Sequence, residues 1–142
     1  MGQPQPGALR GAIPGRPFSL HTDAAHNPTL TRNLAVVSWH SGGLQVIDIE
    51  NPSRMEQAGW YSPTPLESVA NEDPGLSMGT NKVVMWSFPI IKDGLIYVVD
   101  LRNGLYILEY TGPRAHEISS LSFLEGNSNL GDAVRIAKSA GE

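Results

Sequence analysis

The sequence predicts an all-β fold built from two copies of one four-stranded antiparallel unit. Charged residues make up only 17% of the 142 residues, and the 15 glycines and 11 prolines together form a larger share than the usual ~12%. Few charged residues and many turn formers argue against a helical bundle, a coiled coil or a helix-rich nucleotide-binding fold. A hydrophobic content of 40% nevertheless suffices for a packed core. The third observation is an internal repeat, which determines the architecture.

The repeat relates two segments 61 residues apart, without a gap. Gly43–Ile49 (GLQVIDI) matches Gly104–Tyr110 (GLYILEY). The same offset places identical residues together in five further pairs: Pro28 and Pro89, Leu34 and Leu95, Val37 and Val98, Pro52 and Pro113, and Glu56 and Glu117. So many identities exceed what composition supplies, and we interpret the two segments as copies of one supersecondary unit.

The elements of the first copy follow in order. Residues 1–17 are rich in proline and glycine and predict a flexible lead-in. The first repeat covers residues 18–61, and its expected strands are Phe18–Thr22, Leu34–Trp39, Leu44–Ile49 and Glu56–Tyr61. Gly42 and Gly43 supply the turn of the central hairpin, and Pro52 ends the third strand because proline cannot donate to a ladder. Apolar residues on both faces of the third strand predict a strand covered on both sides.

The second copy covers residues 83–123. Its expected strands are Val83–Ile90, Leu95–Asp100, Leu105–Tyr110 and Glu117–Phe123, with Asn103 and Gly104 in the hairpin turn. Residues 62–82, between the copies, predict an irregular surface insertion. Residues 124–142 form a tail, in which Asp132 is a candidate cap for a short helix that ends near Ser139.

Two four-stranded meanders that repeat along a chain are typical of blades of a β-propeller. The segment GLQVIDI ahead of Asn51 and Pro52, with the apolar strands that begin at Leu34 and Leu95, resembles the LVIVD repeat of bacterial β-propeller proteins. The second copy departs from that pattern at Leu108–Tyr110, as a terminal repeat does. The resemblance implies a propeller, commonly in secreted or cell-surface proteins, and it implies no catalytic motif.

Two blades cannot close a ring, because propellers typically need about 4 to 8. We therefore expect an incomplete ring whose partners are the remaining blades of a longer chain, which we favour, or further copies of this chain. A fragment without its N-terminal part would also lack a signal peptide, and residues 1–17 contain no apolar run of the kind that signal peptides have. A compartment is therefore suggested only by the family resemblance.

Charge and cysteine content exclude several classes of function. A net charge of −4 offers no basic surface for nucleic acid, and no apolar run reaches the ~18 residues of a membrane span. The absence of cysteine excludes disulfides, iron–sulfur clusters and cysteine nucleophiles. We expect neither a nucleic-acid partner nor membrane insertion.

Three histidines and one aspartate form the group of residues most suited to metal binding or catalysis. The candidate ligands for a divalent metal are His21, Asp23, His26 and His40. If the strand that carries His21 is innermost in its blade, these side chains approach the central channel. The second copy offers no equivalent, however, because His21 and His26 fall opposite Lys82 and Ser87. Strand-end histidines more often bond to backbone, so the structural interpretation is favoured and no cofactor is predicted.

Three tryptophans are candidates for a ligand-binding surface, namely Trp39, Trp60 and Trp86. Such rings more often fill the space between sheets. The favoured function is a non-enzymatic scaffold that binds a protein or small-molecule ligand through loops such as 62–82. The alternative is a metal-dependent oxidase or hydrolase with a channel-lining site at His21, Asp23 and His26.

Overall fold

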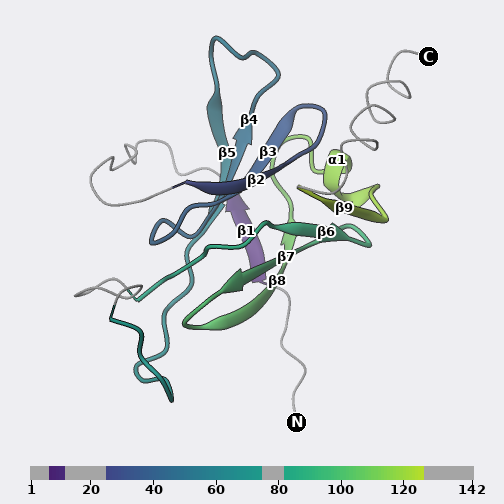
Figure 1. Cartoon of the computed structure of the whole chain (residues 1–142). Coiled ribbons are helices and arrows are strands. Elements are labelled where there is room, and N and C mark those ends of the chain that lie inside the picture. Colours follow the sequence, from purple (N-terminus) through teal and green to yellow (C-terminus); the bar gives the residue numbers. More distant parts are fainter. Residues whose placement is uncertain (1–6, 12–24, 75–81, 127–142) are drawn as a thin grey trace.

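The computed structural model describes residues 7–11, 25–74 and 82–126, and their regular secondary structure is nearly all β-strand (Figure 1). The elements in chain order are β1 (Gly7–Gly11), β2 (His26–Leu30), β3 (Leu34–Ser38), β4 (Leu44–Asp48), β5 (Glu56–Tyr61), β6 (Ile90–Lys92), β7 (Leu95–Asp100), β8 (Gly104–Tyr110), α1 (His116–Ser119) and β9 (Phe123–Glu125). The predicted all-β class with four-stranded antiparallel sheets is confirmed. In this part of the chain, no helix is long and apolar enough to cross a membrane.

The strands form two antiparallel sheets that a single strand joins. The first sheet is the meander β2-β3-β4-β5, and the second has the order β8-β7-β6-β9. Strand β1 pairs antiparallel with β5 and parallel with β8, and Figure 1 shows it running between the two sheets. Residues 7–11 therefore form a strand inside the predicted flexible lead-in, because both neighbouring sheet edges offer them backbone partners.

The sequence repeat is matched by equivalent structure in the central hairpin of each copy. Strands β3 and β7 begin at the equivalent residues Leu34 and Leu95, and β4 and β8 cover equivalent segments. The turns also agree, since Gly43 and Gly104 both have positive φ, at 76° and 100°. The two central hairpins are thus copies of one unit.

The predicted strand Glu117–Phe123 is wrong. Residues 116–119 form α1 instead, and the fourth strand of the second sheet, β9, pairs with β6 rather than β8. Arg114 has a φ of 60°, which turns the chain after Pro113, and the Glu117 side chain then bonds to the first sheet. The edge of β8 that this strand was expected to occupy is taken by β1.

The outer strands also differ from expectation. Of the predicted strand Val83–Ile90 only Ile90 belongs to a strand, although Met85 bridges His40 and Asp100. Side chains provide hydrogen bonds to the backbone of this segment instead. The hydroxyls of Ser38 and Thr29 donate to the carbonyls of Ser87 and Pro89. The predicted strand Phe18–Thr22 and the predicted helix Asp132–Ser139 lie outside the described residues. The strand next to β3 is instead β2. It contains Pro28, which a bulge between His26 and Pro28 accommodates.

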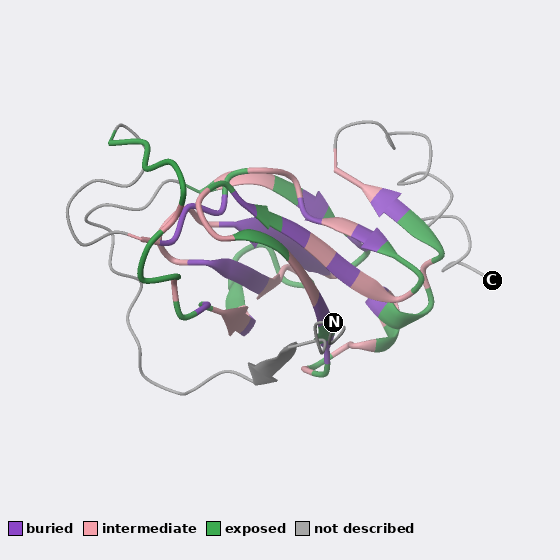
Figure 2. Ribbon diagram, turned by 90° about the horizontal axis from the view of Figure 1, so that it is seen from below, coloured by how far each residue is buried: buried purple, intermediate pink, exposed green. Residues whose placement is uncertain are grey.

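One hydrophobic core lies between the sheets. Its fully buried residues come from both: Leu34, Val36, Leu44 and Val46 of the first sheet, and Ile91, Ile96, Val98 and Leu108 of the second. Figure 2 shows buried residues alternating with exposed or half-buried ones along several strands. All five residues of β3 are buried, so that strand is shielded on both faces.

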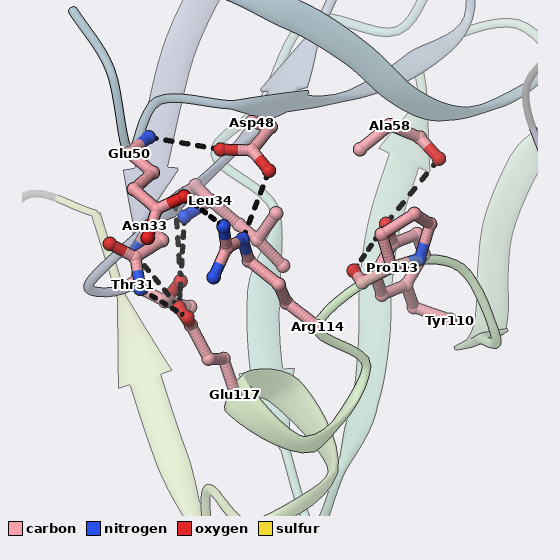
Figure 3. Close-up of polar contacts among 10 residues, drawn as sticks. All are labelled: Thr31, Asn33, Leu34, Asp48, Glu50, Ala58, Tyr110, Pro113, Arg114 and Glu117. Atoms are coloured by element: carbon pink, nitrogen blue, oxygen red, sulfur yellow. Dashed lines mark hydrogen bonds and ion pairs between the residues drawn. The ribbon is translucent and has the colours of Figure 1, made fainter.

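A polar latch of Thr31, Asn33, Asp48, Arg114 and Glu117 ties the sheets together at one end (Figure 3). Glu117 accepts hydrogen bonds from the Thr31 hydroxyl at 2.6 Å and from the Asn33 backbone and side-chain amides at 2.9 and 2.7 Å. Arg114 donates to Asp48 at 2.9 Å and also to Glu50. Partial burial raises the pKa of Glu117, but these hydrogen bonds outweigh it and hold that pKa below its ordinary value.

Candidate functional site

Three of the residues that the sequence singled out meet in one cluster. The ring of His26, at the start of β2, stacks on Trp86 with centroids 4.4 Å apart and planes at 28°. His40, just after β3, meets the same indole edge-on at 5.6 Å and 79°. The sequence assigned the histidines to a metal site and the tryptophan to a separate ligand surface, whereas the structure brings them together.

The backbone around this aromatic cluster is held firmly. Met85, the neighbour of Trp86, donates its amide to the carbonyl of His40 at 3.3 Å, and Ser38 donates to the Ser87 carbonyl at 2.5 Å. His40 and Asn27 have positive φ values of 31° and 47°, a conformation that non-glycine residues seldom adopt. The cluster is therefore fixed by its flanking residues rather than by the ring contacts alone.

His26 has one unusual atom. Its Nδ1 is buried and finds no hydrogen-bond partner among the described residues, although buried polar atoms are normally satisfied. Trp86 beside it is 36% exposed, so the cluster reaches the surface. A neutral imidazole nitrogen is a ligand for transition metals and an acceptor for a hydrogen-bond donor.

The remaining predicted site residues lie elsewhere. Trp60 is on β5, half-buried and paired with Gln45, and Trp39 packs over Gly42 at the end of β3. His21 and Asp23 lie outside the described residues. Over residues 25–74 and 82–126, no three His, Asp or Glu side chains gather into a metal-binding group. The metal site and the three-tryptophan surface both stay predictions.

Sequence reasoning missed an exposed apolar surface on the second sheet. Val99 of β7 pairs with Leu105 of β8, and Tyr97 pairs with Ile107, so these four side chains share the face turned away from the core. Leu105 is 58% exposed, and Leu101, at the end of the hairpin, is 50% exposed. We call this the outer face of the second sheet. The signal was present, because β7 and β8 are apolar at both alternating sets of positions, as in a strand covered on both sides.

The insertion between the repeats is anchored to this hairpin. Arg102, in the β7–β8 turn, donates from Nη2 to Glu72 at 2.7 Å and from Nη1 to the Leu66 carbonyl at 2.7 Å, and only 3% of its side chain is exposed. The Leu66 amide donates to the side chain of Asn103 at 3.0 Å. The hydrogen bonds to Glu72 raise the pKa of Arg102 above its ordinary value. The side chain of Leu66 is left 54% exposed on a loop with a fixed backbone.

The β7–β8 turn has its own internal support. Buried Asp100 accepts hydrogen bonds from the amides of Val84, Arg102 and Asn103 at 3.0, 2.9 and 2.8 Å. One carboxylate therefore fixes both the turn and the segment that leads to Trp86. The apolar hairpin and the aromatic cluster share this support.

Comparison with protein-family models, with curated proteins and with solved structures finds no match to this chain.

Proposed function

We propose that this chain is a non-enzymatic scaffold of propeller-type sheets that binds a partner through its apolar surface. The observation that supports the proposal is the outer face of the second sheet, where Val99, Leu101 and Leu105 are 38%, 50% and 58% exposed. A contiguous exposed apolar patch marks interaction sites in soluble proteins. The resemblance to the LVIVD repeat agrees with this function and adds the expectation of a cell-surface or secreted location.

The rigidity of the surface favours binding without rearrangement. Leu101 follows Asp100, whose carboxylate fixes the turn, and the backbone of Leu66 is bound through Arg102 and Asn103. A surface that is ordered before contact loses less conformational entropy on binding. The hairpin and the anchored part of the insertion would therefore present their apolar side chains in a binding-ready arrangement.

An apolar fluorescent probe, 8-anilinonaphthalene-1-sulfonate, tests this proposal. The natural chain should bind the probe with an increase in fluorescence, and Leu105→Asp should lose most of that increase because a carboxylate interrupts the patch. Met55→Asp is the matched control, since Met55 is 62% exposed and lies in the loop between β4 and β5. Equal probe binding by Leu105→Asp and the natural chain would contradict the proposal.

A metal-dependent oxidase or hydrolase is a second candidate. The observation that favours it is the buried Nδ1 of His26, for which the described residues provide no hydrogen-bond partner. Equilibrium dialysis against Zn²⁺ or Cu²⁺ should then show one bound ion per chain, which His26→Ala removes. His116→Ala is the control, because His116 is exposed on α1. Less than stoichiometric metal in the natural chain would rule this candidate out.

A further inference from the structure

The outer face of the second sheet extends across all four strands of that sheet. Ile91 of β6 and Leu124 of β9 are buried in the core, so the residues on either side of them point the other way. The strand pairing aligns these outward side chains in rows across the sheet. The two rows that cross all four strands, taken from β9 to β8, are Phe123, Lys92, Leu95 and Glu109, and Glu125, Ile90, Tyr97 and Ile107. Val99 and Leu105 begin a third row.

Two opposite charges lie on either side of β7 in the first row. Lys92 of β6 pairs with Leu95 of β7. On the other side, the pairing of β7 with β8 places Glu109 beside Leu95, one residue beyond Leu108. The backbones at Lys92 and Glu109 are therefore two strand spacings apart, about 10 Å. Both residues are exposed, and neither side chain forms an ion pair or hydrogen bond with the described part of the chain.

A second copy of the same face is complementary to this row. When two sheets pack face to face around a twofold axis parallel to β7, β6 of one copy lies over β8 of the other. Lys92 then meets Glu109 of the partner subunit, and by symmetry Glu109 meets Lys92 of the partner subunit. Their long side chains span the ~10 Å between packed sheets. Leu95 and Tyr97 lie at the axis and meet their own counterparts.

A twofold axis across the strands would not match these charges. If it passed through the first row, Lys92 and Glu109 would each lie over the same residue of the partner subunit, and like charges in contact repel. If it passed further along the strands, Glu109 would lie over Ile107 or Leu105 of the partner subunit, which would bury a charge without a counterion. Charge complementarity therefore favours the axis parallel to β7.

We propose that this chain forms a twofold-symmetric dimer through the outer face of its second sheet, with an ion pair between Lys92 and Glu109 formed twice. This inference rests on the proposed scaffold function and names a second copy of the chain as its partner. The apolar rows supply the buried surface, as in homodimer interfaces generally. The two ion pairs determine the orientation and register of the contact.

Charge reversal, followed by size-exclusion chromatography with light scattering over a series of protein concentrations, tests the proposal. The natural chain should show a monomer–dimer equilibrium. Lys92→Glu places two pairs of glutamates in contact and Glu109→Lys two pairs of lysines, so each should weaken dimerisation about tenfold or more. Arg54→Glu is the matched control, because it reverses an exposed charge in the loop between β4 and β5 and should dimerise like the natural chain.

Restoration by mixing is the decisive measurement. Lys92→Glu mixed with Glu109→Lys should form a heterodimer, because both contacts then join a glutamate to a lysine. The double variant Lys92→Glu/Glu109→Lys should likewise dimerise with itself. A dimer formed through another surface or another axis predicts that single reversals have no effect or that mixing restores nothing, and either result would overturn the proposal. Far-UV circular dichroism checks folding, and Lys92→Asp and Glu109→Arg serve if a first variant is unfolded.

A natural chain that is monomeric at every concentration would also overturn the dimer. The scaffold function is tested separately, because the fluorescent probe reports the exposed apolar face in a monomer. Probe binding that Leu105→Asp abolishes, in a chain that does not self-associate, would leave the proposed function standing with a different partner.

Discussion

Glu117 shows how one side chain joins α1 to the first sheet. Its carboxylate accepts three hydrogen bonds from Thr31 and Asn33, all within 2.9 Å. Its equivalent in the repeat, Glu56, is exposed and forms an ion pair with Arg54 at the surface. The two residues are identical in the repeat but have different roles. Neither composition nor spacing predicts this difference, because it depends on the turn of the chain at Arg114.

Glu117→Gln should lower the free energy of unfolding at neutral pH by about 1–3 kcal/mol, because charge-assisted hydrogen bonds to Thr31 and Asn33 are weakened. Urea denaturation measures this loss. Glu56→Gln is the matched control and should change stability by less than about 0.5 kcal/mol, as exposed ion pairs contribute little. Equal effects of the two substitutions would contradict the role assigned to the latch.

Glu117 should also contribute to acid sensitivity. Its pKa is lowered in the folded protein, so its ionised form stabilises the fold above the ordinary value of 4.5, and this contribution disappears as pH falls through the lower folded value. Unfolding free energies measured from about pH 6 down to about pH 3 should therefore fall less steeply in Glu117→Gln than in the natural chain. Parallel pH profiles would show that the carboxylate does not titrate in this way.

The central hairpin is the element that the sequence predicted best. Its strands have apolar runs, and its turns contain glycines that adopt positive φ. The outer strands were predicted less well, because β6 and β9 are only three residues long and their pairing depends on distant segments. The segment before β6 has the sequence pattern of a strand, but the carbonyls of Ser87 and Pro89 accept hydrogen bonds from side chains of the first sheet.

The two hairpin glycines should respond differently to substitution. A Cβ on Gly43 would overlap the carbonyl oxygen of Tyr61, whereas a Cβ on Gly104 would meet nothing within 4 Å. Both have positive φ, so Gly104→Ala should cost about 1–2 kcal/mol from backbone strain alone. Gly43→Ala should cost clearly more, as measured by thermal unfolding of the two variants under identical conditions. A smaller loss for Gly43→Ala would contradict the close approach to Tyr61.

Arg102→Ala should release the insertion from the β7–β8 turn. The substitution removes the guanidinium contacts to Glu72 and to the Leu66 carbonyl, so residues 62–74 lose their main attachment. Limited digestion with a Glu-specific protease should then cut at Glu67 faster than in the natural chain. Arg54→Ala is the control, because Arg54 is exposed and pairs only with Glu56 among the ion pairs described. Unchanged cleavage at Glu67 would show that other contacts hold the loop.

At the scale of the whole molecule, the two sheets depend on one core. The sequence predicted two equivalent units, and the structure shows that the fully buried apolar residues of both sheets belong to a single cluster. The site was less predictable than the fold. Trp86 meets His26 and His40 only because the segment before β6 crosses the first sheet, and no local pattern encodes that contact.

Ile96→Ala should therefore destabilise both sheets together. Ile96 is fully buried between them, and its truncation should cost about 2–5 kcal/mol. Tryptophan fluorescence, which includes Trp60 of the first sheet, and far-UV circular dichroism should give coincident unfolding curves. Val99→Ala, on the outer face, should cost much less. Separate transitions for the two signals would show that the sheets unfold independently.

Strand β1 has a consequence for the order of events during synthesis. Gly7 pairs with Leu108, which leaves the ribosome roughly 5–20 s later at ordinary translation rates. For somewhat less than half of that interval its partner β5 is already made, while β8 is not. A nascent chain could therefore protect the open edge of its first sheet with β1 before the second sheet exists. The strand that joins the two sheets is synthesised before the other described strands, but it completes its pairing only after β8 has been made.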